Sequence, residues 1–165
     1  MQLLGQHPQW LAENAETAIE LGSPGVDLNF GCPAKTVNKS KGGAVLLKET
    51  QALYDIVKAV RDAVPSHIPV SAKIRLGFED KSLAVDNAMA ITEAGASELV
   101  VHARTKTEGY KPPAYWEWIA KIKQHTSIPL VANGEIWSAS DAKRCQDESD
   151  CTNLMVGRGA LALPN

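Results

Sequence analysis

The stretch Val26-Asp27-Leu28-Asn29-Phe30-Gly31-Cys32-Pro33 is an apolar strand that ends in polar and reactive residues. The same arrangement recurs at the ends of other predicted strands, and the paired residues are Asn29 with Cys32, Lys73 with Arg75, His102 with Arg104, Asn133 with Glu135, and Gly157 with Arg158. In a (β/α)₈ barrel all strands are parallel, so these groups would converge on the rim that carries the active site. An open doubly wound sheet would bind its ligand mainly at one switch point. The repeated pattern therefore favours the barrel.

Apolar strands and amphipathic helices alternate from end to end. Strands are predicted at 2–5, 26–29, 70–74, 99–102, 129–132 and 154–156, and helices at 8–21, 50–64, 82–94, 116–124 and 138–147. The glycine-rich segment 30–43 is predicted to be a loop. Strict alternation implies an α/β fold with a parallel sheet and helical crossovers, here as six strand-then-helix units of which the last is unfinished.

Composition describes an ordinary globular domain. The chain has 165 residues, of which 44% are hydrophobic and 22% charged, and its formal charge is −2. That charge excludes a broad basic surface. No apolar run approaches the roughly 20 residues of a membrane helix. The 3 cysteines include no CxxC pair, which argues against a disulfide framework or a zinc site and fits a protein of the reducing cytoplasm.

Cys32 has the most distinctive setting of the three cysteines. It directly follows a strand, Gly31 allows close backbone approach, and Pro33 fixes the turn behind it. A thiol so placed can act as a nucleophile or a general acid, whereas the ordinary alternative is a small buried hydrophobic residue. Cys145 and Cys151 lie on a helix and in a turn and have no comparable setting.

Lys73 and His102 also end apolar strands. An ammonium inside such a strand is costly to bury, so Lys73 either reaches out to solvent or has a function. The functional choices are a Schiff-base lysine or a cation beside an electron-rich ring. His102 is either a satisfied core histidine or a site residue.

The last two strands are followed by a candidate phosphate pocket. Asn133-Gly134-Glu135 follows one strand, and Gly157-Arg158-Gly159-Ala160 follows the next. Barrel enzymes often hold phosphate in the loops after their last two strands. Lys35 lies in the loop after Cys32, where it is either a solvated charge or faces a polyanionic substrate.

Together these residues resemble the tRNA-dihydrouridine synthase family along nearly the whole chain. The segments that carry the resemblance are Asp27-Leu28-Asn29-Phe30-Gly31-Cys32-Pro33, Lys73-Ile74-Arg75-Leu76-Gly77, Val101-His102-Ala103-Arg104-Thr105, Asn133-Gly134-Glu135-Ile136 and Gly157-Arg158-Gly159-Ala160. Segments 134–137 and 6–14 are most similar to the bacterial C-type branch, which modifies uridine sixteen in the D-loop of tRNA.

The resemblance implies an FMN-dependent barrel in which NADPH reduces the flavin. The uridine then accepts a hydride at C6 and a proton at C5, and by position Cys32 would donate that proton. The residues implied for FMN are Gln2, Lys73, His102, Asn133, Gly134, Glu135, Gly157 and Arg158. Those expected to contact or orient the tRNA substrate are Asn29, Lys35, Arg75 and Arg104.

A whole barrel needs about 250 residues, so residues 1–165 are predicted to be a partial FMN-binding TIM-barrel catalytic domain. By the resemblance, its strands correspond to about strands three to eight, without the first two βα units and the C-terminal helical domain. The full-length enzyme is expected to be a monomer without metal or membrane attachment. Three alternatives remain: an aldolase-like phosphate-binding barrel with a Schiff-base Lys73, a flavin barrel acting on a free pyrimidine, and an inactive fragment.

Overall fold

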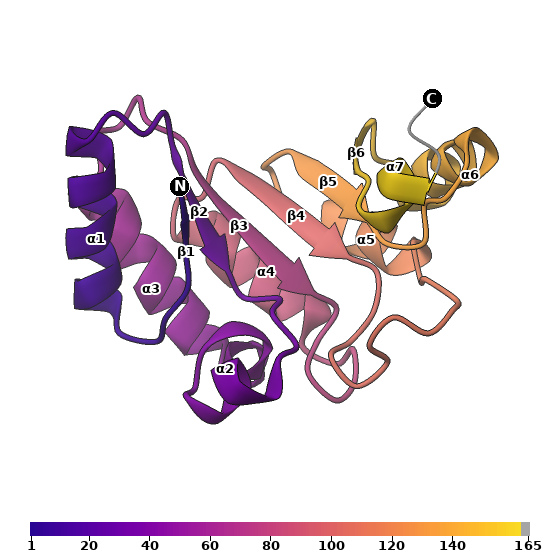
Figure 1. Cartoon of the computed structure of the whole chain (residues 1–165), viewed down its shortest axis with the longest axis horizontal. Coiled ribbons are helices and arrows are strands. Elements are labelled where there is room, and N and C mark those ends of the chain that lie inside the picture. The colour runs from indigo at the N-terminus through magenta and orange to yellow at the C-terminus, as the bar shows by residue number, and fades with distance from the viewer. Residues whose placement is uncertain (163–165) are drawn as a thin grey trace.

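The computed structural model describes residues 1–162 and contains a parallel sheet covered by helices (Figure 1). The strands are β1 (Gln2–Leu3), β2 (Val26–Asn29), β3 (Val70–Arg75), β4 (Glu98–His102), β5 (Leu130–Asn133) and β6 (Asn153–Met155). The helices are α1 (Pro8–Glu20), α2 (Lys35–Lys39), the 3₁₀ helix η1 (Gly43–Lys48), α3 (Thr50–Ala63), α4 (Ala84–Glu93), α5 (Glu117–Lys123), α6 (Ala139–Ser149) and α7 (Arg158–Ala162).

The sheet has its strands in the order β1-β2-β3-β4-β5-β6, with every neighbouring pair parallel. Sequential order is that of a barrel wall, whereas a doubly wound sheet reverses its strand order at a switch point. Helices α3, α4 and α5 lie behind the sheet in Figure 1, α1 lies beside α3 at the left, and no helix covers β2, β3 and β4 on the side facing the viewer. The predicted partial (β/α)₈ barrel is therefore confirmed.

The two faces of the sheet differ in polarity. Leu28, Ile74 and Leu99 are fully buried and belong to the same apolar cluster as Leu53 and Ile56 of α3. The alternate residues of the strands point to the other face, because successive side chains of a strand point to opposite sides. In β2 and β3 these are Asp27, Asn29, Ser71, Lys73 and Arg75, of which Arg75 is buried and the others are half-buried. The polar face is the one that carries the site.

Segment 30–43 differs from its prediction as a loop. It contains the short helix α2, and the unpredicted η1 begins at its end. Gly43 has a φ of 65°, a conformation that glycine adopts without strain. A Cβ added at Gly43 would lie 2.8 Å from the carbonyl oxygen of Cys32. This segment is therefore packed against the cysteine instead of forming a free loop.

Other helix and strand ends agree with the prediction to within about two residues, the usual uncertainty of such boundaries. Ser138 caps α6 in a capping box with Asp141. The sequence also predicts that a last helix begins at Asn165, and this position lies outside the described residues. Within residues 1–162, no helix is long and apolar enough to cross a membrane.

Candidate functional site

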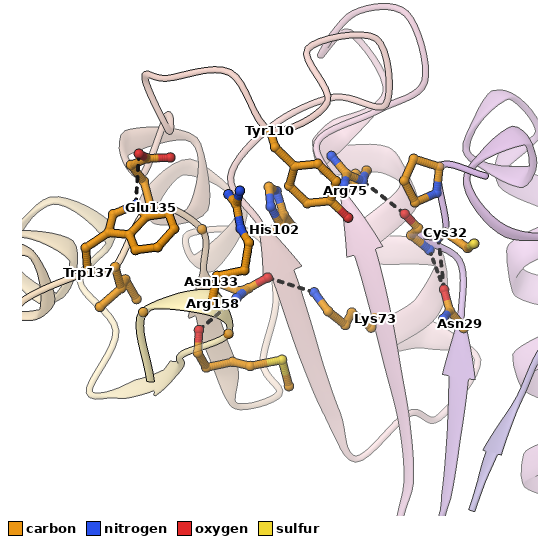
Figure 2. A pocket seen from close by; sticks show the side chains of 17 residues that line it. Asn29, Cys32, Lys73, Arg75, His102, Tyr110, Asn133, Glu135, Trp137 and Arg158 are labelled. Atoms are coloured by element: carbon orange, nitrogen blue, oxygen red, sulfur yellow. Dashed lines mark hydrogen bonds between the residues drawn. The ribbon is translucent and has the colours of Figure 1, made fainter. Parts of the chain in front are cut away.

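A cavity of about 420 Å³ lies at the carboxyl ends of the strands, on the polar face of the sheet (Figure 2). The predicted site residues that line it are Asn29, Cys32, Lys73, Arg75, His102, Asn133, Gly134, Glu135, Gly157 and Arg158. Its remaining lining residues are Gly31, Pro33, Tyr110, Ile136, Trp137, Met155 and Gly159. The strand ends that the sequence singled out thus converge on one cavity.

The backbone of Cys32 is held from both sides. The Asn29 side-chain oxygen accepts hydrogen bonds from the N–H groups of Gly31 and Cys32, each at 3.0 Å. On the other side, the carbonyl of Cys32 accepts from the Asn38 amide at 2.8 Å and from the N–H of Ala44 at 3.0 Å. These bonds fix the position of the cysteine at the cavity wall, where its side chain is half-buried.

Arg75 ties the cysteine segment to the loop after β4. Its Nε donates to the carbonyl of Gly31 at 2.9 Å, and its Nη1 donates to the carbonyls of Thr105 at 3.1 Å and Gly109 at 2.8 Å. Only 3% of Arg75 is exposed. Burial lowers the pKa of its guanidinium, and the nearby Tyr110 opposes that shift. Arg75 therefore places a partly desolvated cation at the cavity while bracing two of its loops.

Lys73 reaches across the cavity floor to Asn133. Its Nζ donates to the Asn133 side-chain oxygen at 2.9 Å, and the Asn133 amide donates to the carbonyl of Met155 at 2.7 Å (Figure 2). Burial and the Arg75 charge lower the pKa of Lys73 to about 8, against the opposing influence of Asp27. At neutral pH the side chain is mostly an ammonium, but it loses its proton far more readily than an exposed lysine.

His102 is a neutral imidazole at physiological pH. Burial and the positive charges of Arg75, Lys73 and Arg104 lower its pKa to about 3. Its Nδ1 is buried and has no hydrogen-bond partner among residues 1–162. An unpaired buried polar atom is costly, so this nitrogen has bonding capacity for a molecule in the cavity.

Two glycines lie at the start of α7, with Gly157 directly before the helix and Gly159 as its second residue. A Cβ on Gly159 would lie 2.1 Å from the carbonyl oxygen of Ile136, so only glycine allows α7 to pack against the segment after β5. A Cβ on Gly157 would meet no atom of the described residues within 4 Å, which leaves open space above it. Gly159 therefore serves packing, whereas Gly157 leaves room for a ligand.

Arg158 lies between two aromatic rings at the cavity wall. Its guanidinium carbon is 4.9 Å from the ring centroids of both Tyr110 and Trp137, within the range of cation–π attraction. Tyr110 also lies 5.0 Å from the guanidinium carbon of Arg75. The rings hold two arginines near the cavity without neutralising their charge.

Glu135 is the acidic residue of the cavity lining, and Arg104 is its partner. The two form an ion pair, and Trp137 Nε1 donates to the other carboxylate oxygen at 3.0 Å. Burial would raise the pKa of Glu135, but the bonds from Arg104 and Trp137 keep it below its usual value. Glu135 has a φ of 57°, unusual for a residue with a side chain, and its carboxylate faces Arg104.

Three residues singled out from the sequence do not line the cavity. Gln2 is exposed and adjoins the lining residue Asn29, from whose amide it accepts a hydrogen bond at 3.1 Å. Arg104 is completely buried and reaches the cavity only through Glu135. Lys35 is exposed on α2.

The structure also adds residues that the sequence did not reveal. Tyr110 and Trp137 lie in irregular segments with no periodic pattern, so only their proximity to Arg158 identifies them. Cys145 and Cys151 are buried, and burial raises the pKa of both, that of Cys145 to about 12. Cys32 is thus the cysteine that faces the cavity.

Comparison with known proteins identifies relatives over the whole chain. The family model described as dihydrouridine synthase (Dus) matches residues 1–165. The tRNA-dihydrouridine(16) synthase of Shewanella oneidensis is 61% identical over 165 residues, which are 100% of this chain and 52% of that protein. The protein of the same name from Aquipseudomonas alcaligenes is 57% identical over 99% of this chain and 52% of its own length.

The chain therefore spans about half the length of the curated relatives it matches. Among solved structures, a mandelate racemase/muconate lactonizing family protein from Azoarcus sp. EbN1 aligns with a TM-score of 0.65 at 18% identity, over 94% of this chain and 35% of that one. An N-succinyl Arg/Lys racemase from Bacillus cereus aligns with a TM-score of 0.63 at 14% identity, over 90% and 34% of the two chains. At such low identities the likeness concerns the fold alone.

Proposed function

Because the chain belongs to the dihydrouridine synthase family, we propose that it forms the catalytic part of an enzyme that reduces uridine to 5,6-dihydrouridine in the D-loop of tRNA. FMN would be its cofactor and NADPH its reductant. The C-type branch and uridine sixteen are the finer form of this proposal, which the names of the relatives support. The convergence of the strand-end residues on one cavity is the observation that carries it.

The residues of the cavity fit a bound FMN. The cavity volume of about 420 Å³ lies within the range of small-molecule sites. Lys73, Arg75 and Arg158 bring three cations to the lining, whereas the Glu135 carboxylate is already paired with Arg104. An excess of positive charge suits a phosphate group and an anionic reduced ring. Among residues 1–162, the open space above Gly157 leaves steric room and the unpaired Nδ1 of His102 leaves bonding capacity.

Each residue has a proposed part in holding the cofactor. Arg158, with the backbone at Gly157, would bind the phosphate, and Asn133, Gly134 and Glu135 would line the ribityl chain. Lys73 would hold its ammonium near the ring, where the lowered pKa keeps it close to the point of proton loss. His102 would offer a neutral imidazole, and Gln2, which adjoins the lining residue Asn29 outside the cavity itself, would contact the edge of the ring. When bound, FMN supplies the hydride that is added to C6 of the uracil.

Cys32 would supply the proton. Its thiol would donate to C5, so that hydride and proton together add across the C5–C6 double bond. General acid catalysis depends on the distance between the acid and the atom it protonates. The hydrogen bonds to the backbone N–H and carbonyl of Cys32 fix the backbone that carries the thiol at the cavity wall. Asn29 and Arg75 are the proposed substrate contacts, Lys35 a phosphate contact of the tRNA, and Arg104 a residue that orients Glu135.

The first experiment is an absorbance spectrum of the purified full-length protein, followed by a dihydrouridine assay on tRNA. Flavin bands and NADPH-dependent dihydrouridine formation are expected. A colourless protein in which borohydride traps a substrate on Lys73 would instead identify an aldolase-like barrel. Flavin-dependent activity on free uracil or dihydroorotate, with none on tRNA, would identify a different flavin enzyme.

A further inference from the structure

We propose that Asp27 is a positioning residue, which sets the direction of the hydrogen bonds that hold Cys32. Asp27 lies on β2 and does not line the cavity. It contacts neither Cys32 nor its N–H group; instead it acts through the side chains of Gln2 and Asn29. The catalytic consequence of this inference rests on the proposed function of Cys32, but the structural relationship does not.

The connection is a continuous series of side-chain hydrogen bonds. The Gln2 amide donates to the Asp27 carboxylate at 2.7 Å, and the Asn29 amide donates to the Gln2 oxygen at 3.1 Å. The Asn29 oxygen then accepts from the N–H groups of Gly31 and Cys32. Ser71 donates to the second carboxylate oxygen of Asp27 at 2.9 Å.

Asp27 determines which way these amides face. A carboxylate only accepts hydrogen bonds, so it turns the NH₂ group of Gln2 toward itself and the oxygen of Gln2 toward Asn29. That oxygen in turn takes the NH₂ group of Asn29 and leaves the Asn29 oxygen for the backbone. The N–H groups at the far end only donate, so both ends of the series require the same direction.

A reversed Asn29 would face two N–H donors with its own NH₂ group, and both bonds would be lost. Within residues 1–162 the N–H groups of Gly31 and Cys32 have no other hydrogen bond. The neighbouring N–H of Phe30 instead donates to the carbonyl of Lys73 at 2.9 Å, so it belongs to the sheet. Loss of direction would therefore loosen the cysteine without opening the sheet.

Amide hydrogen exchange in Asp27→Leu measures this relationship directly. Without the carboxylate, the N–H groups of Gly31 and Cys32 should exchange up to about tenfold faster, the effect of one hydrogen bond. That of Phe30 should keep its rate and serves as the internal reference. Gln2→Leu interrupts the series while Asp27 stays in place, and it should raise the exchange rates of Gly31 and Cys32 in the same way. This variant replaces Asp27→Leu in the test if Asp27→Leu does not fold.

Asp27→Asn separates direction from charge. The asparagine oxygen can still accept from Gln2, while its amide donates to the Ser71 hydroxyl, which can accept as well as donate. Exchange at Gly31 and Cys32 should therefore return to the wild-type rate, although the negative charge is gone. Asp62→Asn, at an exposed ion pair of α3, is the matched control and should change neither rate.

Unchanged exchange at Gly31 and Cys32 in both leucine variants would overturn the proposal. Fast exchange in Asp27→Asn equal to that in Asp27→Leu would also overturn it, because charge would then be responsible. In the assay on tRNA, Asp27→Leu should lose dihydrouridine formation and Asp27→Asn should recover it. If even the wild type formed no dihydrouridine, the proposed function would fail, whereas the exchange result would still decide the role of Asp27.

Discussion

The ammonium of Lys73 donates a hydrogen bond to the Asn133 side-chain oxygen at 2.9 Å, although β4 lies between the strands that carry them. Lys73 stands opposite Val100 in the register, and Asn133 stands opposite His102. The lysine side chain thus crosses β4 above Val100, on the polar face of the sheet. This bond joins the two halves of the cavity floor.

Binding of an anionic ligand should depend on the protonation of Lys73. Burial lowers its pKa to about 8, so the ammonium is complete well below pH 8 and is lost as the pH rises through that value. FMN affinity, measured by fluorescence quenching from pH 6.5 to 9.5, should weaken across this range. Lys73→Met should bind more weakly at neutral pH and lose the transition near pH 8. A transition that persists in Lys73→Met would assign it to another group.

Cys32→Ala should separate the two half-reactions. The variant should keep bound flavin and oxidise NADPH, but lose at least about 100-fold in dihydrouridine formation, the usual weight of a general acid. Rapid-reaction absorbance measures the first step and nucleoside analysis of tRNA the second. Cys145→Ala, which changes a buried cysteine outside the cavity, is the control and should retain both. Full activity of Cys32→Ala would remove the cysteine from the reaction.

The ion pair between Arg104 and Glu135 should stabilise the fold. Glu135→Leu would leave the buried Arg104 guanidinium without its carboxylate, at an expected cost of about 3–5 kcal/mol in the free energy of unfolding. Urea denaturation provides the measurement. The control is Asp62→Leu, at the exposed Lys58–Asp62 pair, where the expected cost is about 0–1 kcal/mol. Equal losses in the two variants would contradict a special role for the buried pair.

Gly157→Ala and Gly159→Ala should have different effects despite their proximity. The added methyl group on Gly159 would collide with the carbonyl of Ile136, and overpacking of this kind costs about 1–3 kcal/mol. Gly157→Ala should melt like the wild type but bind FMN more weakly, since its methyl group enters open space beside the cavity. Thermal unfolding and flavin titration distinguish the two. A destabilised Gly157→Ala together with a Gly159→Ala of wild-type stability would contradict these roles of the two glycines.

His102 should make the fold sensitive to acid. Its pKa is lowered from 6.5 to about 3 in the folded protein. As the pH falls below 6.5, the imidazole therefore becomes protonated in the unfolded chain while it stays neutral in the native state. Stability should therefore decrease by about 1–2 kcal/mol between pH 6.5 and 5. His102→Gln should show a correspondingly shallower decrease in urea denaturation over that range. Equal slopes in the two proteins would mean that His102 does not resist protonation.

The sequence determined the class of fold and most of the cavity lining. Strands and helices have periodic apolar patterns that depend only on neighbours along the chain, so the alternation of strands and helices could be predicted from the sequence. Parallel strands bring their carboxyl ends to one edge, so the polar groups there, such as Cys32, Lys73 and His102, could be expected to meet. Gly157 was recognised for the same reason.

Only the tertiary structure decided which of these side chains bond to one another. Arg104 follows the same strand as His102, yet it is completely buried and reaches the cavity only through Glu135. Tyr110 and Trp137 lie in irregular segments, and only the folded structure places them beside Arg158 at the cavity. The series from Asp27 to Cys32 required the strand register, because Gln2 and Asp27 are neighbours only across the sheet. Such contacts depend on packing between segments distant in sequence, which local periodicity does not record.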